Sequence, residues 1–239
     1  MDKKRLTVFK IGMRDGIPIM LGYFAVSFTF GMMAVQGGLS VFQAVLTSLL
    51  NLTSAGQFAG LDIMLAAGSL WEMALTQLVI NSRYMLMSFS VGQKLEKKSA
   101  FGHRFGVAFG MTDEIFGISM LRPGEVSPFY IYGAMAVAIP GWTVGTLVGA
   151  FAGEILPAAV ISALSIAIYG MFLAIIIPPA RKNLTLVWVI IGAMLLSTAF
   201  KYVPGLNKVS SGFAIIIVTV VVASIAAIVR PIKEDGKNE

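Results

Sequence analysis

Long apolar runs alternate with short polar stretches along most of the chain. A helix needs about 20 mostly apolar residues to cross a bilayer core about 30 Å thick, and such runs occur at residues 17–36, 71–91, 130–152, 158–178, 184–203 and 210–229. Two further stretches, 40–68 and 105–121, are interrupted by polar residues and glycines. The pattern predicts an all-α polytopic integral membrane protein with about six to eight membrane helices, including broken or re-entrant segments.

Composition supports a membrane protein. Of the 239 residues, 57% are hydrophobic and 13% are charged, with a mean hydropathy of +0.84, whereas a soluble domain has about 25% charged residues. The chain therefore reads as one transmembrane domain over residues 1–239, with a short polar C-terminal tail at 231–239.

Basic residues set the expected orientation. Positive charge beside a span favours the cytoplasmic side, and no small-residue cleavage site follows residues 1–15 at signal-peptide distance, so we expect these residues to remain as a cytoplasmic N-terminus. The same rule explains the net charge of +6 without a nucleic-acid partner. The basic residues before the first predicted span are Lys3, Lys4, Arg5, Lys10 and Arg14.

A second basic cluster, residues 93–104, should also be cytoplasmic, so an even number of crossings should precede it. This requires 40–68 to cross an even number of times, either as a re-entrant pair or as two short helices broken near Ser54–Gly56. The alternative is a single crossing by 40–68, which places the 93–104 cluster outside. Irregular backbone at membrane depth is tolerated where it lines a cavity, which is where transporters place substrate sites.

Three polar clusters interrupt the apolar background, at 51–62 (NLTSAGQFAGLD), 81–90 (NSRYMLMSFS) and 110–117 (GMTDEIFG). Their hydrogen-bonding and charged side chains make them the candidate binding segments. The candidate substrate-binding residues are Asn51, Ser54, Gly56, Gln57, Phe58, Asn81, Arg83, Thr112, Asp113 and Glu114.

Arg83 needs an anionic neighbour, because a charge at membrane depth costs at least about 2.5 kcal/mol and is usually paired. Asp113 or Glu114 is the expected partner. Two alternatives stay open: Arg83 only holds helices together, or 105–121 is a cytoplasmic loop. Asp62 and Glu72 flank a short apolar segment and are expected at the membrane interface.

Small residues such as Gly31, Gly145 and Gly149 are expected at helix contacts, because they let backbones approach closely. Catalysis finds no support. The only histidine, His103, lies in a basic loop, HExxH and GxSxG motifs are absent, and there is no cysteine to act as a nucleophile or metal ligand. We therefore predict no catalytic residue, no metal site and no cofactor.

Taken in order, GIPIMLGYFAVSFTFGMMAVQGGLS, SAGQFAG, NSRYMLMS and TDEIFG resemble the AzlC family of bacterial branched-chain amino acid permeases, over about residues 14–120. The family's N-x-R-Y and T-D-E patterns correspond to Asn81, Arg83 and Tyr84 and to Thr112–Glu114. Its A-G-S-x-Q-F pattern is altered here to Ser54–Phe58. The resemblance implies export of valine, leucine, isoleucine or methionine across the bacterial inner membrane, with a small AzlD-type membrane subunit as partner.

A zwitterionic amino acid needs a donor for its carboxylate, an acceptor for its ammonium and an apolar pocket. A helix break at Ser54–Gln57 can offer amide donors at the positive end of a helix dipole, and Asp113 or Glu114 can hold the ammonium. The chain lacks the nucleotide-binding motif GxxxxGK[ST], so we expect ion coupling through one of these two carboxylates. An uncoupled channel or facilitator and a purely structural membrane subunit are the alternatives. The expected walls of the apolar pocket are Phe58, Met85 and Phe116.

Overall fold

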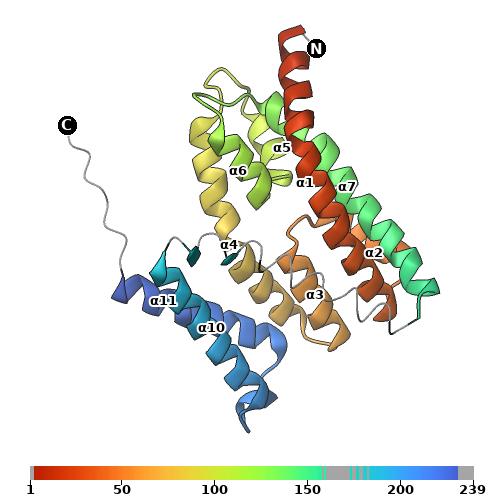
Figure 1. Ribbon diagram of the computed structural model, residues 1–239, viewed down its shortest axis with the longest axis vertical. Coiled ribbons are helices and arrows are strands. Elements are labelled where there is room, and N and C mark those ends of the chain that lie inside the picture. The colour runs from red at the N-terminus through yellow and green to blue at the C-terminus, as the bar shows by residue number, and fades with distance from the viewer. Residues whose placement is uncertain are drawn as a thin grey trace. The chain divides into compact units, whose positions relative to one another are not determined.

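The computed structural model describes residues 3–157 and 183–230, together with residues 159, 173, 176, 177, 180 and 181. Most of the predicted span 158–178 and the tail 231–239 lie outside the described residues. The described part of the chain contains helices and no strand, which confirms the all-α class (Figure 1). The chain divides into two compact units, residues 1–58 with 81–169 and residues 59–80 with 170–239.

Among the described residues, four helices are long and apolar enough to cross a membrane: α1 (Lys3–Gln36), α7 (Pro128–Ile155), α10 (Leu184–Tyr202) and α11 (Ser211–Val229). They contain nearly all of four predicted spans. A fifth predicted span, 71–91, lies inside α4 (Leu70–Lys94). The middle of α4 is polar, and α4 is not among the four helices that are apolar enough to cross. The 34 residues of α1 span about 51 Å at 1.5 Å per residue, so α1 is longer than the bilayer core is thick and its basic first turns extend beyond it.

The two polar stretches each form a pair of short helices. The first pair is α2 (Val41–Leu50) and α3 (Ala55–Leu65), and the second is α5 (Gly102–Phe109) and α6 (Asp113–Leu121). The longest has 11 residues and spans about 17 Å, roughly half of the bilayer core. The predicted break in 40–68 is confirmed, although its non-helical residues, Asn51–Ser54, begin earlier than expected. A second break at Gly110–Thr112 divides 105–121.

In the first unit, α1 and α7 lie side by side along most of their length (Figure 1). Glycines allow this approach, as the sequence predicts: a Cβ added at Gly149 would overlap the carbonyl oxygen of Phe28, and one at Gly31 would overlap that of Thr146. α7 continues through Pro140 without interruption. The α1–α7 pair forms the core against which α2, α5 and α6 pack.

In the second unit, α10 packs against α11, and the N-terminus of α11 meets the first turn of α4. The Glu72 carboxylate accepts hydrogen bonds from the Ser210 hydroxyl and from the Gly212 amide, the latter at 3.0 Å. Glu72 is only 5% exposed, so its carboxylate is buried among protein groups, and its expected position at the membrane interface stays a prediction. The first amides of a helix lack intrahelical partners, and this carboxylate satisfies one of them.

Candidate functional site

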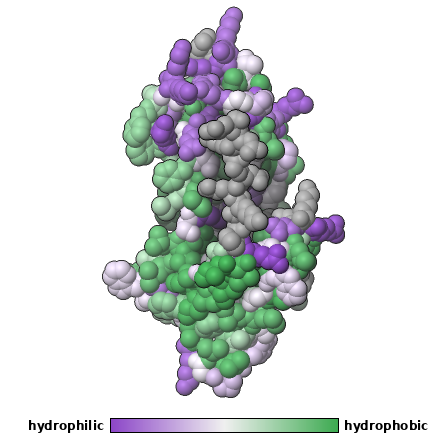
Figure 2. Space-filling model, turned by 90° about the vertical axis from the view of Figure 1, so that its left-hand side faces the viewer, coloured by the Kyte–Doolittle hydropathy of each residue, from purple (hydrophilic) through white to green (hydrophobic). Residues whose placement is uncertain are grey.

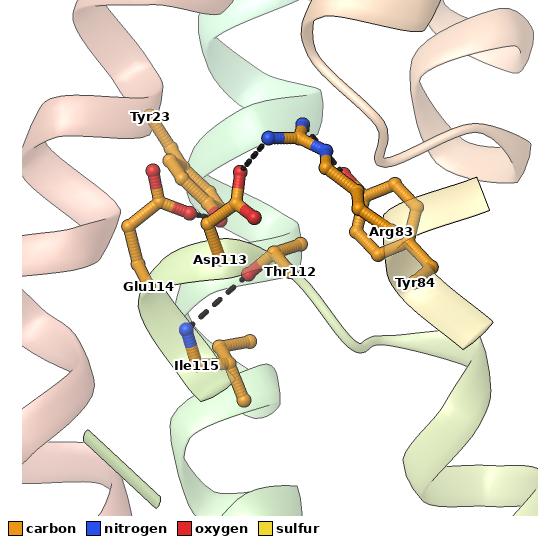
Figure 3. Close-up of polar contacts among 7 residues, drawn as sticks. All are labelled: Tyr23, Arg83, Tyr84, Thr112, Asp113, Glu114 and Ile115. Atoms are coloured by element: carbon orange, nitrogen blue, oxygen red, sulfur yellow. Dashed lines mark hydrogen bonds and ion pairs between the residues drawn. The ribbon is translucent and has the colours of Figure 1, made fainter. Parts of the chain in front are cut away.

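The second break ends at an acidic helix N-terminus. Thr112 is the N-cap of α6, and its hydroxyl accepts a hydrogen bond of 3.4 Å from the Ile115 amide. Asp113 and Glu114 follow in the first turn of α6 (Figure 3). The positive end of the helix dipole stabilises carboxylates at these positions. Local sequence therefore explains why two adjacent acids are tolerated here.

Of the two predicted partners of Arg83, Asp113 forms the ion pair, with 2.6 Å between the guanidinium Nη1 and the carboxylate Oδ2. The two side chains are 43% and 40% exposed, so neither member of the pair is buried. The ring of Tyr84 lies 5.2 Å from the guanidinium carbon of Arg83 and supports it from the other side. Arg83 is thus held between a carboxylate and an aromatic ring.

Glu114 has a different partner. The hydroxyl of Tyr23, on α1, donates a hydrogen bond of 2.5 Å to its carboxylate (Figure 3). Tyr23 is 8% exposed, and sequence reasoning did not select it. The two neighbouring carboxylates are therefore chemically distinct: Asp113 faces a cation, and Glu114 faces a neutral donor.

Buried contacts connect Glu114 to the first break. The rings of Tyr23 and Trp142 meet edge to face at 5.3 Å, and the Trp142 indole N–H donates a hydrogen bond of 3.0 Å to the Gln57 side-chain oxygen. The Gln57 amide group donates one of 2.6 Å to the Ser48 hydroxyl. Trp142 and Gln57 are each 1% exposed. Trp142 was also missed, although a tryptophan N–H in the middle of an apolar span needs an acceptor.

The first break is held by its own side chains. Asn51 accepts hydrogen bonds from the amide and hydroxyl of Thr53, at 3.1 and 2.6 Å. Ser54 has a φ of 47°, which strains a residue other than glycine. Asn51 and Gln57 are predicted substrate ligands, and in this structure both side chains form hydrogen bonds within the protein. Their direct role in substrate binding stays a prediction.

The other selected residues are dispersed around these contacts. Gly56 and Phe58 are buried in the first turn of α3, and the Phe58 ring packs edge to face on Phe30 at 5.4 Å. Asn81 is half-buried on α4, two residues before Arg83, and Phe116 is half-buried on α6. The structure therefore does not show the three expected wall residues in one place.

An apolar pocket of about 520 Å³ lies between α4 and α5. Tyr84, which contacts Arg83, and Met111, which precedes Thr112, both line it. Met85 lines it too, so this wall residue lies next to an apolar space. Within the described ranges, no group of three or more histidine or acidic side chains is arranged to hold a metal ion.

Comparison with known proteins identifies the family of the chain. Residues 18–156 match the AzlC protein family. The chain is 36% identical to an uncharacterized membrane protein of Archaeoglobus fulgidus, over 72% of this chain and 75% of that protein. It is 32% identical to the inner membrane protein YgaZ of Escherichia coli, over 61% of each chain. No solved structure matches significantly. The family match includes the two breaks and the residues that join them, and the chain belongs to the AzlC family of membrane proteins.

Proposed function

We propose that the protein is a secondary transporter that exports branched-chain amino acids by coupling their movement to an ion gradient. The observation that carries this proposal is the pair of adjacent carboxylates with unlike partners, Asp113 on Arg83 and Glu114 on the Tyr23 hydroxyl. A coupled transporter needs one group that binds substrate and one that carries the ion. These two carboxylates suit the two tasks.

The Arg83–Asp113 pair suits a zwitterion. An amino acid that enters between the two side chains places its ammonium on Asp113 and its carboxylate on Arg83, so neither charge loses its counterpart. The exposure of both side chains, 43% and 40%, leaves room for entry. Amides at the start of α3 are further candidate donors for the carboxylate.

The neighbouring pocket supports an apolar substrate. It has a volume of about 520 Å³ and is lined by Tyr84, which contacts Arg83, and by Met111, two residues before Asp113. An aliphatic side chain of valine, leucine, isoleucine or methionine gains about 0.8 kcal/mol per buried methylene in such a space. A polar side chain gains nothing comparable, which favours branched-chain amino acids and methionine.

Glu114 is suited to bind and release the coupled proton. Its partner is a neutral hydroxyl that can either donate to a carboxylate or accept from a carboxylic acid, so the contact with Tyr23 can persist in both protonation states. Protonation of Glu114 reverses the direction of this hydrogen bond and so changes the interaction that positions Tyr23. The Tyr23 ring packs edge to face on Trp142. Trp142 in turn donates a hydrogen bond to Gln57, so the protonation state of Glu114 can influence the conformation of the first break.

The complete transporter, in this proposal, includes a small AzlD-type membrane subunit and lies in a bacterial inner membrane with its N-terminus in the cytoplasm. The location is supported by the name of the Escherichia coli relative, an inner membrane protein. The orientation is supported by the basic residues in the first turns of α1.

The test is accumulation of labelled valine in inverted membrane vesicles under an imposed proton gradient, with the small subunit coexpressed. We expect accumulation by the unaltered protein and its loss in Arg83→Ala and Asp113→Asn at unchanged protein levels. The matched control is Gln93→Ala, an exposed residue near the end of α4. Valine that equilibrates without accumulating would instead indicate an uncoupled facilitator. Full accumulation in both variants would contradict the proposed site.

A further inference from the structure

A pocket of about 440 Å³ lies at the N-terminal end of α1, in the first unit. Three segments far apart in sequence form it: the first turns of α1, the connection between α4 and α5, and the start of α7. Figure 2 shows hydrophilic side chains gathered at this end. The charged and titratable side chains in its wall are Lys4, Arg5, Glu96, Lys98 and His103.

One aromatic ring holds two of these groups in place. The guanidinium carbon of Arg5 lies 5.1 Å from the centre of the Phe129 ring, and the His103 ring lies 5.5 Å from the same ring. The Tyr132 hydroxyl donates a hydrogen bond of 3.2 Å to the His103 carbonyl oxygen and lies 3.1 Å from His103 Nδ1. Both contacts tie the His103 ring and backbone to the start of α7.

The backbone fixes the connection between α4 and α5 to the start of α7. The Glu96 amide donates a hydrogen bond of 3.0 Å to the Val126 carbonyl, and the Val126 amide donates one of 2.8 Å to the Lys94 carbonyl. These bonds form an isolated bridge centred on Leu95 and Val126. Backbone hydrogen bonds therefore fix the segment that carries Lys98 to the residues just before α7.

Membrane insertion alone does not require this arrangement. The positive-inside rule needs basic residues near the ends of spans but does not need them around one pocket. Lys4, Arg5 and Lys98 bring three positive charges against one negative charge on Glu96, which leaves a net charge of +2 with His103 neutral. A phosphate monoester carries about −1.5 to −2 at pH 7, and small-molecule sites have volumes of about 300–1,000 Å³.

We propose that this pocket binds a phosphate group, presented either by an anionic phospholipid headgroup or by a soluble phosphate. Arg5 supplies the planar donor group, Lys4 and Lys98 add charge, and the aromatic wall limits their movement. In the orientation given under the proposed function, the site opens to the cytoplasm. It is separate from the residues assigned to transport, so its binding can be tested without a transport measurement.

The experiment uses the full chain in two kinds of lipid nanodisc. In phosphatidylcholine discs, inorganic phosphate is titrated and the midpoint temperature of unfolding is followed, because a ligand that binds the folded state raises it. In the second arm, phosphatidylglycerol is added to the discs without free phosphate. Arg5→Gln is expected to weaken the effect about tenfold, the loss of one charge-assisted contact. Lys98→Gln tests the same site from another segment if Arg5→Gln does not fold.

The matched control is Lys10→Gln, which removes one charge from an exposed position of the same helix that does not line the pocket. Stabilisation by inorganic phosphate that Arg5→Gln or Lys98→Gln weakens and Lys10→Gln preserves supports a soluble ligand. The same pattern with phosphatidylglycerol alone supports a lipid headgroup. The proposal is overturned if neither phosphate source raises the midpoint, or if Lys10→Gln weakens the effect as much as the pocket variants do.

Discussion

Tyr23 donates a hydrogen bond of 2.5 Å to Glu114, although 91 positions separate the two residues in the chain. The same tyrosine ring rests on Trp142, which donates to Gln57 at the start of α3. The long helices α1 and α7 thus carry the side chains that connect the two helix breaks.

The first prediction concerns the buried amide of Gln57. Gln57→Leu removes the acceptor of the Trp142 N–H and leaves that group buried without its partner, which costs about 1–3 kcal/mol. We expect a clearly lower midpoint temperature of unfolding in detergent. Gln93→Leu, the same change at an exposed position, should leave the midpoint within error. An equal midpoint for the two variants would show that the Trp142–Gln57 contact contributes nothing to stability.

The second prediction concerns the contact between α1 and α7. A methyl group at Gly149 would overlap the Phe28 carbonyl, so Gly149→Ala should destabilise the protein by about 1–3 kcal/mol, the usual cost of overpacking. Gly22 is also helical but has open space around it. Gly22→Ala should be neutral or stabilise by up to about 1 kcal/mol, because alanine favours helix. Thermal unfolding of both variants measures the difference, and the opposite order would argue against the close approach.

The third prediction concerns Glu72 in the second unit. Glu72→Ala removes the acceptor for Ser210 and Gly212, and bonds to a charged group contribute about 1.5–3 kcal/mol each. Hydrogen exchange of amides in the first turn of α11 should become faster. Asp62→Ala, at an exposed acid on α3, is the control and should leave that exchange unchanged. Unchanged exchange in Glu72→Ala would mean that the carboxylate does not cap α11.

Sequence reasoning recovered the elements and part of the site. Apolar length predicted the long helices, the basic clusters required a break in 40–68, and the cost of a lone charge narrowed the partner of Arg83 to Asp113 or Glu114. It missed Tyr23 and Trp142, because in an apolar span an aromatic residue that packs and one that donates a hydrogen bond look alike. It did not identify the partners of Glu72, because its donors lie about 140 residues away. Polar contacts between residues far apart in the chain cannot be predicted from the local pattern of apolar and polar positions.

If Asp113 binds substrate and Glu114 carries the proton, substitutions at these two residues affect exchange and accumulation differently. Exchange of labelled for unlabelled valine across vesicles needs substrate binding but no net proton movement, whereas accumulation needs both. We predict that Glu114→Gln keeps exchange and loses proton-driven accumulation, and that Asp113→Asn loses both. Protein levels in the membrane are the control for each variant.

The most direct test is therefore valine exchange by Glu114→Gln, measured beside its proton-driven accumulation in the same vesicles. Exchange near the rate of the unaltered protein, with accumulation abolished, is the predicted result. Loss of exchange together with accumulation would place Glu114 in substrate binding and contradict the division of roles, and so would accumulation that survives the substitution.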